Sequence, residues 1–383
     1  MISWKFKSEN CLPIGLAIDN GTIRMIQFCA KAGRLEVLDA AERVVDLSGQ
    51  KDGGMARSLI ISAISDMLEK GEFKGREVVS CLPSDELKIT SIRLAANQQE
   101  QIENVLAQEA EKRFGFDTKK DIINYIFVGE IQQGEETRQE LILLAAKDEV
   151  IREHISLLEE AGLVPVFLDA APCALFRAFE RFLKRNEDRK KISVFIDFGR
   201  QFTTVVFSRG DEIGFVKQIP VGSDNFTAAA AERLGVDFEQ AQVLRAVLRK
   251  EKETQGGTGV SELLMQGGNV AIQSSLDRST RQTLTDALTG AAEEVVKEIS
   301  LCFRYYTVTF RGERIEKAFI SGSEACEKAL ANVLSRHLSC EIELASPLRG
   351  INLKNATIGL DRRESLCEWS IPAGLALKGY SNL

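Results

Sequence analysis

Histidine is scarce in this 383-residue chain, and its scarcity excludes much of the chemistry that depends on imidazole. The chain has two histidines, His154 and His337, so a histidine-rich metal site or a Ser-His-Asp triad is close to excluded. His154 falls on a charged helix predicted for residues 148–160, and His337 falls near a predicted helix end. We therefore expect both histidines at the surface.

The sequence also lacks long apolar runs, basic clusters and paired cysteine motifs. No apolar run reaches the roughly 20 residues that a bilayer requires, and the N-terminus does not resemble a signal peptide, which predicts a cytoplasmic protein. A net charge of -7 without an arginine- or lysine-rich cluster argues against nucleic acid as a partner. The 8 cysteines form no C-x-x-C motif and lie mostly in apolar runs, so we expect unpaired thiols in a reducing compartment.

One short pattern occurs twice in the chain. Asp19-Asn20-Gly21 and Asp197-Phe198-Gly199 each follow an apolar run, and each precedes a second strand-like run and a corner with a basic residue and a glycine. With 44% hydrophobic residues, the chain can bury the cores of two or more domains. The repeat predicts two related domains that face one cleft.

An Asp-x-Gly turn at the end of a strand suits a nucleotide. Glycine lets backbone N–H groups approach phosphate oxygens, and the carboxylate can hold a hydrated Mg²⁺ between the phosphates. A single such turn is more often an ordinary hairpin, but two opposed turns would clamp one polyphosphate from both sides. Asp19 and Asp197 are therefore the predicted metal ligands.

Further units are predicted around the two repeats. Residues 86–166 alternate strand, helix, strand, strand and helix, which is typical of a compact α+β insertion. Residues 184–191 have the composition of a solvated linker, and the polar, glycine-rich residues 250–281 that of a long loop. A third glycine turn, Ser321-Gly322-Ser323, lies between a strand and a helix, where backbone N–H groups can again meet an anion.

Two Asp-x-Gly hairpins followed by a strand-glycine-helix turn resemble the two phosphate loops and the adenosine loop of the actin, hexokinase and Hsp70 fold. Within that fold the chain is similar to the PilM family of type IV pilus assembly, which is itself similar to the division protein FtsA. The segments that carry the resemblance are residues 17–21, 107–112, 157–165, 196–199, 203–204, 219–222, 298–299, 303–306 and 375–379.

The resemblance implies an α/β, actin-like two-domain fold with an FtsA/PilM-type subdomain 1C inserted. The implied subdomains are 1A at residues 10–85, 167–190 and 368–383, 1C at 86–166, 2A at 191–222 and 313–367, and 2B at 223–312. The implied ligands are ATP and Mg²⁺ in the cleft between the domains. The implied nucleotide-binding residues are Asp19, Gly21, Thr22, Arg24, Asp197, Gly199, Arg200, Thr203, Thr204, Gly222, Gly322 and Ser323.

The resemblance also implies partners. A groove beside 1C would capture the cytoplasmic N-terminal tail of a PilN-like bitopic membrane protein, and a pilus assembly ATPase or platform proteins would join it at the inner membrane. Peripheral membrane association would come through these partners, and a homo-oligomer is left open. A scaffold of this kind needs no catalytic residue. No side chain stands out as a base for phosphoryl transfer, so we expect weak ATP hydrolysis at most.

Departures from the family pattern leave alternatives open. The first turn is shorter than the family's, Arg200 replaces a small residue, and Glu324 adds a negative charge beside the third turn. The shortened first turn favours a nucleotide-free scaffold similar to GspL of type II secretion, whereas the intact second turn favours ATP, and Arg200 could either reach a phosphate or fill the site. A small-molecule kinase of the same fold would need an acid over a substrate hydroxyl. Asp169 stands at a strand end, but we expect it to cap the following helix.

Overall fold

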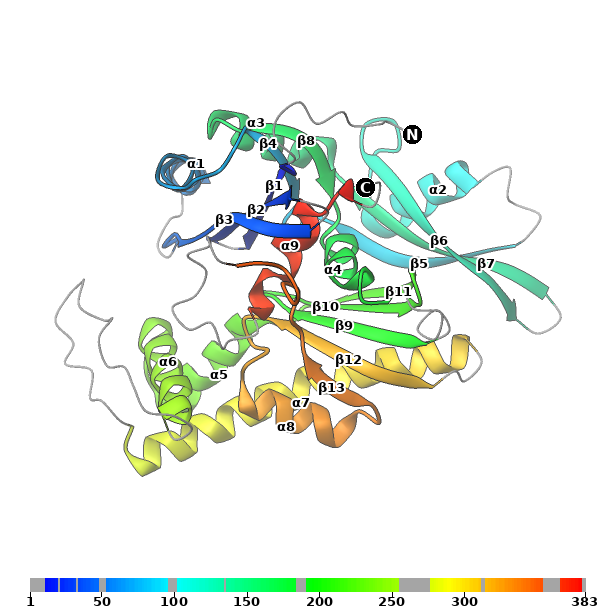
Figure 1. Ribbon diagram of the computed structural model, residues 1–383. Helices are drawn as coiled ribbons and strands as arrows, with labels where there is room; N and C mark the ends of the chain where they lie inside the picture. The colour runs from blue at the N-terminus through cyan, green and yellow to red at the C-terminus, as the bar shows by residue number, and fades with distance from the viewer. Residues whose placement is uncertain are drawn as a thin grey trace.

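The computed structural model describes residues 11–19, 21–31, 34–47, 53–95, 102–133, 136–183, 191–254, 276–310, 314–353 and 366–380. These residues form two five-stranded sheets, a three-stranded sheet and the helices that cover them (Figure 1). The two larger sheets lie one above the other, and the three-stranded sheet lies to one side of them (Figure 1). The predicted α/β class follows from this arrangement.

The first sheet has the strand order β3-β2-β1-β4-β8. Its strands are β1 (Ile14–Asp19), β2 (Thr22–Lys31), β3 (Arg34–Val44), β4 (Glu77–Cys81) and β8 (Val164–Asp169). The first three strands pair antiparallel, whereas β4 runs parallel to both β1 and β8. The first Asp-x-Gly turn therefore joins the central strand of this sheet to its antiparallel neighbour.

The second sheet repeats this topology strand for strand. Its strands are β9 (Ile192–Phe198), β10 (Thr203–Arg209), β11 (Glu212–Ile219), β12 (Ile315–Gly322) and β13 (Glu341–Leu344). They stand in the order β11-β10-β9-β12-β13, with three antiparallel strands followed by parallel ones. The duplication predicted from the two turns is thus a duplication of the whole sheet.

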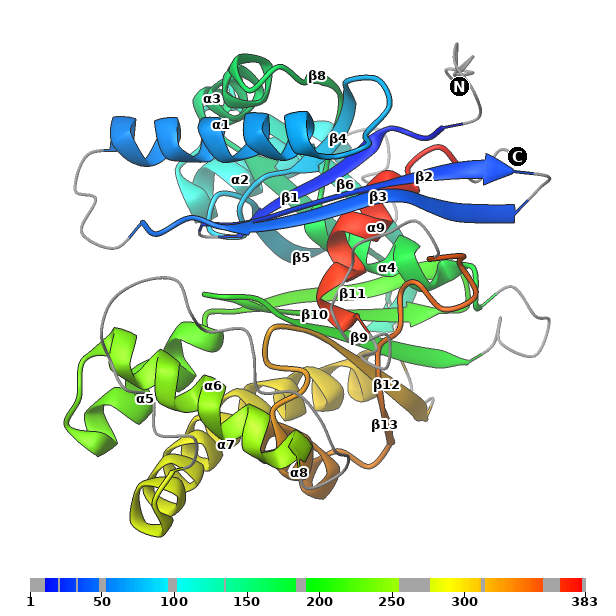
Figure 2. The same cartoon turned by 60° about the vertical axis from the view of Figure 1, so that its left-hand side comes forward.

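Helices lie outside and between the two large sheets (Figure 2). On the outer side of the first sheet are α1 (Gly53–Lys70) and α3 (Asp148–Glu160). On the far side of the second sheet are α5 (Ser223–Leu234), α6 (Phe238–Thr254), α7 (Arg278–Thr309) and α8 (Lys328–His337). Between the sheets are α4 (Ala171–Glu180) and α9 (Ser370–Ala376).

The two middle helices pack with their backbones in direct contact. A side-chain carbon added to Gly374 of α9 would lie 1.8 Å from the carbonyl oxygen of Ala174 in α4. One added to Gly15 of β1 would lie 2.1 Å from the carbonyl oxygen of Pro372. Glycine is required at both places because no side chain fits between the backbones. A helix from near the end of the chain therefore covers the inner face of the first sheet.

The three-stranded sheet forms a separate unit with α2 (Ile102–Phe114). Its antiparallel strands, in the order β5-β7-β6, are β5 (Lys88–Ala95), β6 (Ile122–Gln133) and β7 (Glu136–Ala146). One face packs on α2. The other face packs through Ile142 on the core of the second domain, which is the domain built on the second five-stranded sheet. This unit lies within the predicted range 86–166.

Helix α3 falls in the same range but packs elsewhere. Its Leu158 joins Ile14 and Leu16 in the core of the first domain, which is the domain built on the first five-stranded sheet. The subdomain boundaries stay a prediction, and those at residues 10, 190, 312, 313 and 383 lie outside the described residues.

The long loop predicted at residues 250–281 is helical at both ends. Helix α6 continues to Thr254, and α7 begins at Arg278 after Asp277, whose Oδ1 accepts the N–H groups of Ser279 and Thr280. Residues 255–275 of that loop, and residues 184–190 of the predicted linker, lie outside the described residues. Within the described ranges no helix combines the length and apolarity needed to cross a membrane.

Two expectations about single residues are wrong. His154 is buried, its Nε2 lies 3.0 Å from the hydroxyl of Ser80, and burial lowers the pKa of His154 to about 4. His154 lies four residues before the buried Leu158, so both occupy the inner face of α3. The expectation of unpaired thiols fails for Cys11 and Cys29, which form a disulfide with Cα atoms 4.1 Å apart. His337, by contrast, is exposed as expected.

Candidate functional site

The two Asp-x-Gly turns face each other in direct contact, at the place predicted for the cleft between the domains. The Oδ2 atom of Asp19 accepts a hydrogen bond from the backbone N–H of Arg200 at 2.9 Å. A side-chain carbon added to Gly199 would lie 3.3 Å from that same oxygen. Asn20, in the middle of the first turn, lies outside the described residues. The opposed arrangement predicted from the repeat is therefore observed, with the turns close enough to bond each other directly.

Asp197 is a buried acid at the centre of this arrangement. The residue is 8% exposed, and the hydroxyl of Ser321 donates to its Oδ1 atom at 2.7 Å. Burial is the main reason that the pKa of Asp197 is raised to about 6, the Ser321 hydrogen bond opposes the rise, and the charge of Asp19 adds to it. Burial also raises the pKa of Asp19, against the Arg200 N–H and the charge of Arg24. Because burial makes it costly for both acids to ionise, a bound cation would stabilise their charged forms.

Arg24 places a positive charge near Asp19 and Asp197. Its Nε donates to Glu42 Oε2 at 2.5 Å, and its Nη2 donates to the carboxylate of Glu368 on η3 (Cys367–Trp369). Its positive charge lowers the pKa of both Asp19 and Asp197. Neither glutamate is assigned from the sequence, and Arg24 contacts these acids rather than standing alone as a phosphate ligand.

The other residues of the second turn support the turn itself. The hydroxyl of Thr203 donates to the carbonyl of Val221 at 2.7 Å, and the guanidinium Nε of Arg200 lies 2.9 Å from Asp224 Oδ1. A side-chain carbon added to Gly222 would lie 2.5 Å from the carbonyl oxygen of Arg200. Arg200 thus packs back on the start of α5 and leaves its backbone N–H facing Asp19.

Three more of the predicted residues hold the strands that flank the turns. Gly21 has a φ of +89°, a conformation that favours glycine, and its carbonyl accepts the N–H of Val45 at 2.8 Å. Thr22 pairs with Asp19 across the first hairpin, and Thr204 pairs with Asp197 across the second. Asp19 is in the pair next to its turn, whereas Asp197 is one pair farther from its turn, because Phe198 pairs with Thr203.

The third glycine turn lies directly against the second. The N–H and the hydroxyl of Ser323 both donate to the carbonyl of Phe198, at 3.0 and 3.1 Å. A side-chain carbon added to Gly322 would lie 2.3 Å from that carbonyl oxygen. All three turns predicted from the sequence thus meet at one place.

Glu324, expected as an added negative charge at the third turn, is neutralised by α6. Its carboxylate is 1% exposed and bonds the guanidinium of Arg245 and, at 2.8 Å, that of Arg249. Arg249 also reaches Glu327 at 3.5 Å. This buried cluster holds α6 against the third turn. Helix periodicity alone does not indicate it, because the partners are far apart in the sequence.

The residue types at the cleft fit a hydrated Mg²⁺ and phosphate. The carboxylates of Asp19 and Asp197 are ligands that Mg²⁺ prefers, and the backbone N–H of Arg200 suits a phosphate oxygen. That N–H now donates to Asp19, so a phosphate would have to replace the contact. In the described part of the chain, no three Cys, His, Asp or Glu side chains gather as a metal cluster. Magnesium would therefore rely on one or two carboxylates, with water and phosphate completing its shell.

Asp169, the acid considered for a kinase, is part of an ion pair. Its Oδ2 lies 2.7 Å from Arg177 Nη1 and 3.7 Å from Lys378 Nζ. Helix α4 begins after Ala170, which makes no side-chain cap. The expected helix cap is wrong, and Asp169 instead ties α4 to the end of the chain.

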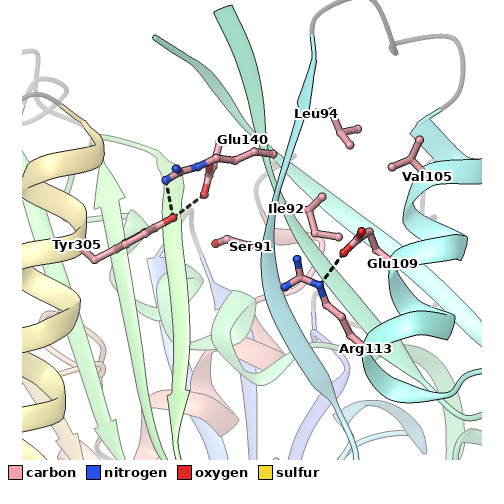
Figure 3. Close-up of a pocket in the computed structure, with 9 residues that line it drawn as sticks. Ser91, Ile92, Leu94, Val105, Glu109, Arg113, Glu140 and Tyr305 are labelled. Carbon is pink, nitrogen blue, oxygen red and sulfur yellow. Dashed lines mark hydrogen bonds and ion pairs between the residues drawn. The ribbon is translucent and has the colours of Figure 1, made fainter. Parts of the chain in front are cut away.

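A separate pocket of about 430 Å³ lies beside the three-stranded sheet (Figure 3). Strand β5 runs through its middle, α2 forms one wall, and Tyr305 of α7 stands on the other side (Figure 3). The pocket is lined by Ser91, Ile92, Arg93, Leu94, Val105, Glu109, Arg113, Glu140 and Tyr305. It therefore reaches both faces of β5.

Polar contacts frame this pocket on the Tyr305 side. Arg93 donates through Nε to Glu140 at 2.8 Å and through Nη2 to the Tyr305 hydroxyl at 2.9 Å, and that hydroxyl donates to Glu140 at 3.2 Å. On the α2 side, Arg113 donates to Glu109 at 2.7 Å. Ser91 carries a buried hydroxyl without a hydrogen-bond partner among the described residues. The pocket thus combines paired charges, apolar side chains and one unsatisfied hydroxyl.

The strand at the pocket is also a sheet edge. Within the described residues, β5 pairs with β7 on one side and has no strand on the other. The outward backbone groups of an edge strand can pair with an added strand. The pocket therefore lies where an extended peptide could join the sheet.

Comparison with known proteins identifies the family. Residues 15–254 match the family model described as type IV pilus assembly protein PilM. The chain belongs to the PilM family. The actin-like fold predicted from the sequence is confirmed for this family member. No curated protein sequence matches it.

Two solved structures share the fold of this PilM-family chain over most of its length. A chain of the PilM-PilN type IV pilus biogenesis complex has a TM-score of 0.71 at 20% identity, covering 96% of this chain and 98% of that one. The ethanolamine utilization protein EutJ from Carboxydothermus hydrogenoformans has a TM-score of 0.53 at 12% identity, covering 96% and 89%. At these identities the likeness is one of fold.

Proposed function

We propose that this PilM-family chain is a cytoplasmic actin-like scaffold of the inner-membrane platform that assembles a type IV pilus or a type II secretion-like machine. Family membership supports the platform role. The similarity of fold to a chain solved in a PilM-PilN complex supports a PilN-like partner. The scaffold binds the cytoplasmic N-terminal tail of a PilN-like bitopic protein, which keeps it at the inner membrane together with a pilus assembly ATPase or platform proteins.

The pocket beside β5 is the proposed site for the tail, and it is the observation that carries this function. An extended peptide along the free edge of β5 would form main-chain hydrogen bonds and direct alternate side chains to opposite faces. Ile92 and Val105 offer an apolar wall on the α2 side, and Ser91 and Tyr305 offer polar partners on the other. Such recognition needs no catalytic group.

A variant with a larger side chain in the pocket tests whether the tail binds there. The probe is a synthetic peptide with the cytoplasmic N-terminal sequence of a single-span membrane protein encoded beside this chain, titrated by fluorescence anisotropy. Val105→Trp places an indole in the pocket and should weaken binding at least about tenfold, or ~1.4 kcal/mol. Gln108→Trp adds the same side chain on the exposed face of α2 and should leave affinity unchanged. Equal affinity of the wild type and Val105→Trp would remove the pocket from the proposal.

ATP with Mg²⁺ between the two Asp-x-Gly turns is the second part of the proposal. Magnesium would neutralise phosphate charge while Asp19 and Asp197 hold it, and the N–H of Arg200 would turn from Asp19 to phosphate. Gly322 and Ser323 form the neighbouring turn on which the nucleoside end would rest. Separation of Asp19 from Arg200 is the opening step, because their 2.9 Å contact now joins the domains.

A nucleotide-free scaffold is the second candidate. The direct bond between Asp19 and Arg200 favours it, because the turns satisfy each other without a ligand. Calorimetric titration with Mg·ATP separates the two. Binding heat that Asp197→Ala abolishes and the exposed-site control Asp211→Ala retains supports ATP, whereas no heat with the wild type assigns the nucleotide-free form. Tail binding is measured separately, so either part can fail alone.

A further inference from the structure

Two cysteines lie side by side next to the third glycine turn. The Sγ atoms of Cys326 and Cys367 are 4.0 Å apart although the residues are separated by 41 positions. Cys326 follows the third glycine turn, and Cys367 begins η3, with its Sγ 3.8 Å from the carbonyl oxygen of Gly322. A disulfide needs an S–S distance of about 2.05 Å. Side-chain rotation must therefore bring the sulfur atoms about 2 Å closer.

The segment that carries Cys367 connects the two domains. Cys367 is buried in the core of the second domain, and Trp369, two positions later, is buried in a core of the first. Glu368 between them bonds Arg24 at the cleft. A bond to Cys367 would thus act at the point where the chain crosses from one domain to the other.

The turn that carries Cys326 is held in place on both sides. Glu324 and Glu327 flank Cys326, and both are buried and paired with Arg249. Cys326 itself is exposed, whereas Cys367 is 3% exposed. An oxidant therefore reaches Cys326 first. The thiol of Cys367 is then close enough to attack the mixed disulfide formed on Cys326.

We propose that Cys326 and Cys367 form a modification site, a dithiol that closes to a disulfide between the third glycine turn and η3. The oxidant is a low-molecular-weight disulfide such as oxidised glutathione. The Cys326 thiolate attacks one glutathione sulfur and releases one glutathione, and the Cys367 thiolate then attacks the Cys326 sulfur and releases the second. The two cysteines lose two electrons and two protons in total, and glutathione disulfide becomes two glutathione thiols.

The closed form joins η3 covalently to the residues that follow β12 and the third glycine turn. Because Glu368 extends from η3 to Arg24, the bond would also restrict the segment that holds Glu368 against Arg24. The expected result is an oxidised protein in which residues 366–371 exchange amide hydrogens more slowly than in the reduced protein.

Mapping of disulfides in the full chain tests the proposal. The protein is equilibrated across a series of reduced to oxidised glutathione, alkylated, digested and analysed by mass spectrometry. We expect the loss of two alkylatable thiols and the appearance of a linked Cys326–Cys367 peptide. Cys326→Ser should abolish the linked peptide, and Cys340→Ser, a change at another thiol of the second domain, should retain it.

Two results would overturn the proposal. One is a Cys326-glutathione mixed disulfide that persists at every ratio without an internal bond. The other is a bond from Cys326 to a cysteine other than Cys367. Cys326 is exposed, so its serine variant is expected to fold, and the peptide from Cys11 and Cys29 shows in the same digest how the disulfide already present responds to each ratio.

Discussion

Replacement of Asp197 by asparagine should stabilise the folded protein at neutral pH. Burial is the main cause that raises the pKa of Asp197 to about 6 from its ordinary value of 3.8. At neutral pH the folded wild type therefore holds a buried negative charge that the unfolded chain exposes to water. Asparagine has no charge to bury, and its amide oxygen can still accept the hydroxyl of Ser321, which now donates at 2.7 Å.

The size and pH dependence of this gain follow from the pKa. Between pH 3.8 and about 6 the folded protein retains a proton that the unfolded chain releases, so the free energy of unfolding of the wild type falls as the pH rises. Below this window both states are protonated, and above it the loss is complete. A difference of about two pH units corresponds to ~3 kcal/mol. The gain from Asp197→Asn should therefore grow from near zero at pH 4 to that value at pH 7.

Urea unfolding at several pH values, followed by circular dichroism, measures the gain. Asp277→Asn is the control, because Asp277 caps α7 and the hydroxyl of Thr280 is the main cause that lowers its pKa below 3.8. Its effect should be a loss of stability that stays constant between pH 5 and pH 8. A flat difference for Asp197→Asn over that range, or a less stable variant at pH 8, would refute the reasoning.

Further predictions concern the packing around the cleft, and urea midpoints measure each. Gly374→Ala should lower the free energy of unfolding by about 3 kcal/mol, because the added carbon would meet the Ala174 carbonyl at 1.8 Å. Gly290→Ala, at a position in α7 where nothing lies within 4 Å, should instead add up to about 1 kcal/mol, and similar effects of both changes would contradict the close contact. Glu324→Gln should cost about 3–5 kcal/mol, because it leaves the buried guanidinium of Arg245 without its carboxylate. Glu343→Gln, in a partly exposed pair with Lys317, should cost at most about 1 kcal/mol. An equally small cost for Glu324→Gln would show that leaving the Arg245 guanidinium without its carboxylate does not destabilise the protein.

The duplicated turns allowed two related domains to be predicted because they carry local information. An aspartate and a glycine at the end of an apolar strand specify a hairpin within a few residues, and two copies indicate two similar sheets. The observed sheets have the same strand topology, and the turns around Asp19 and Asp197 meet. Turn chemistry and strand periodicity were sufficient for this part of the structure.

The partners of the site residues could not be predicted in the same way. Arg24 bonds Glu368, and Glu324 bonds Arg245, between segments that come together only in the folded chain. Charge pattern identifies these residues as polar but does not say which acid meets which base. The pairing of Cys11 with Cys29 spans only 18 positions, but it depends on the register of β2 against the residues before β1.

The position of α9 has a consequence for synthesis of the chain. The inner face of β1, β2 and β4 is covered by α9, although the strands come from the start of the chain and the helix from residues 370–376. A ribosome that makes these strands early must complete the second domain before the helix emerges. We therefore expect the amino-terminal half to mature last, and chains cut short before Ser370 to depend on chaperones.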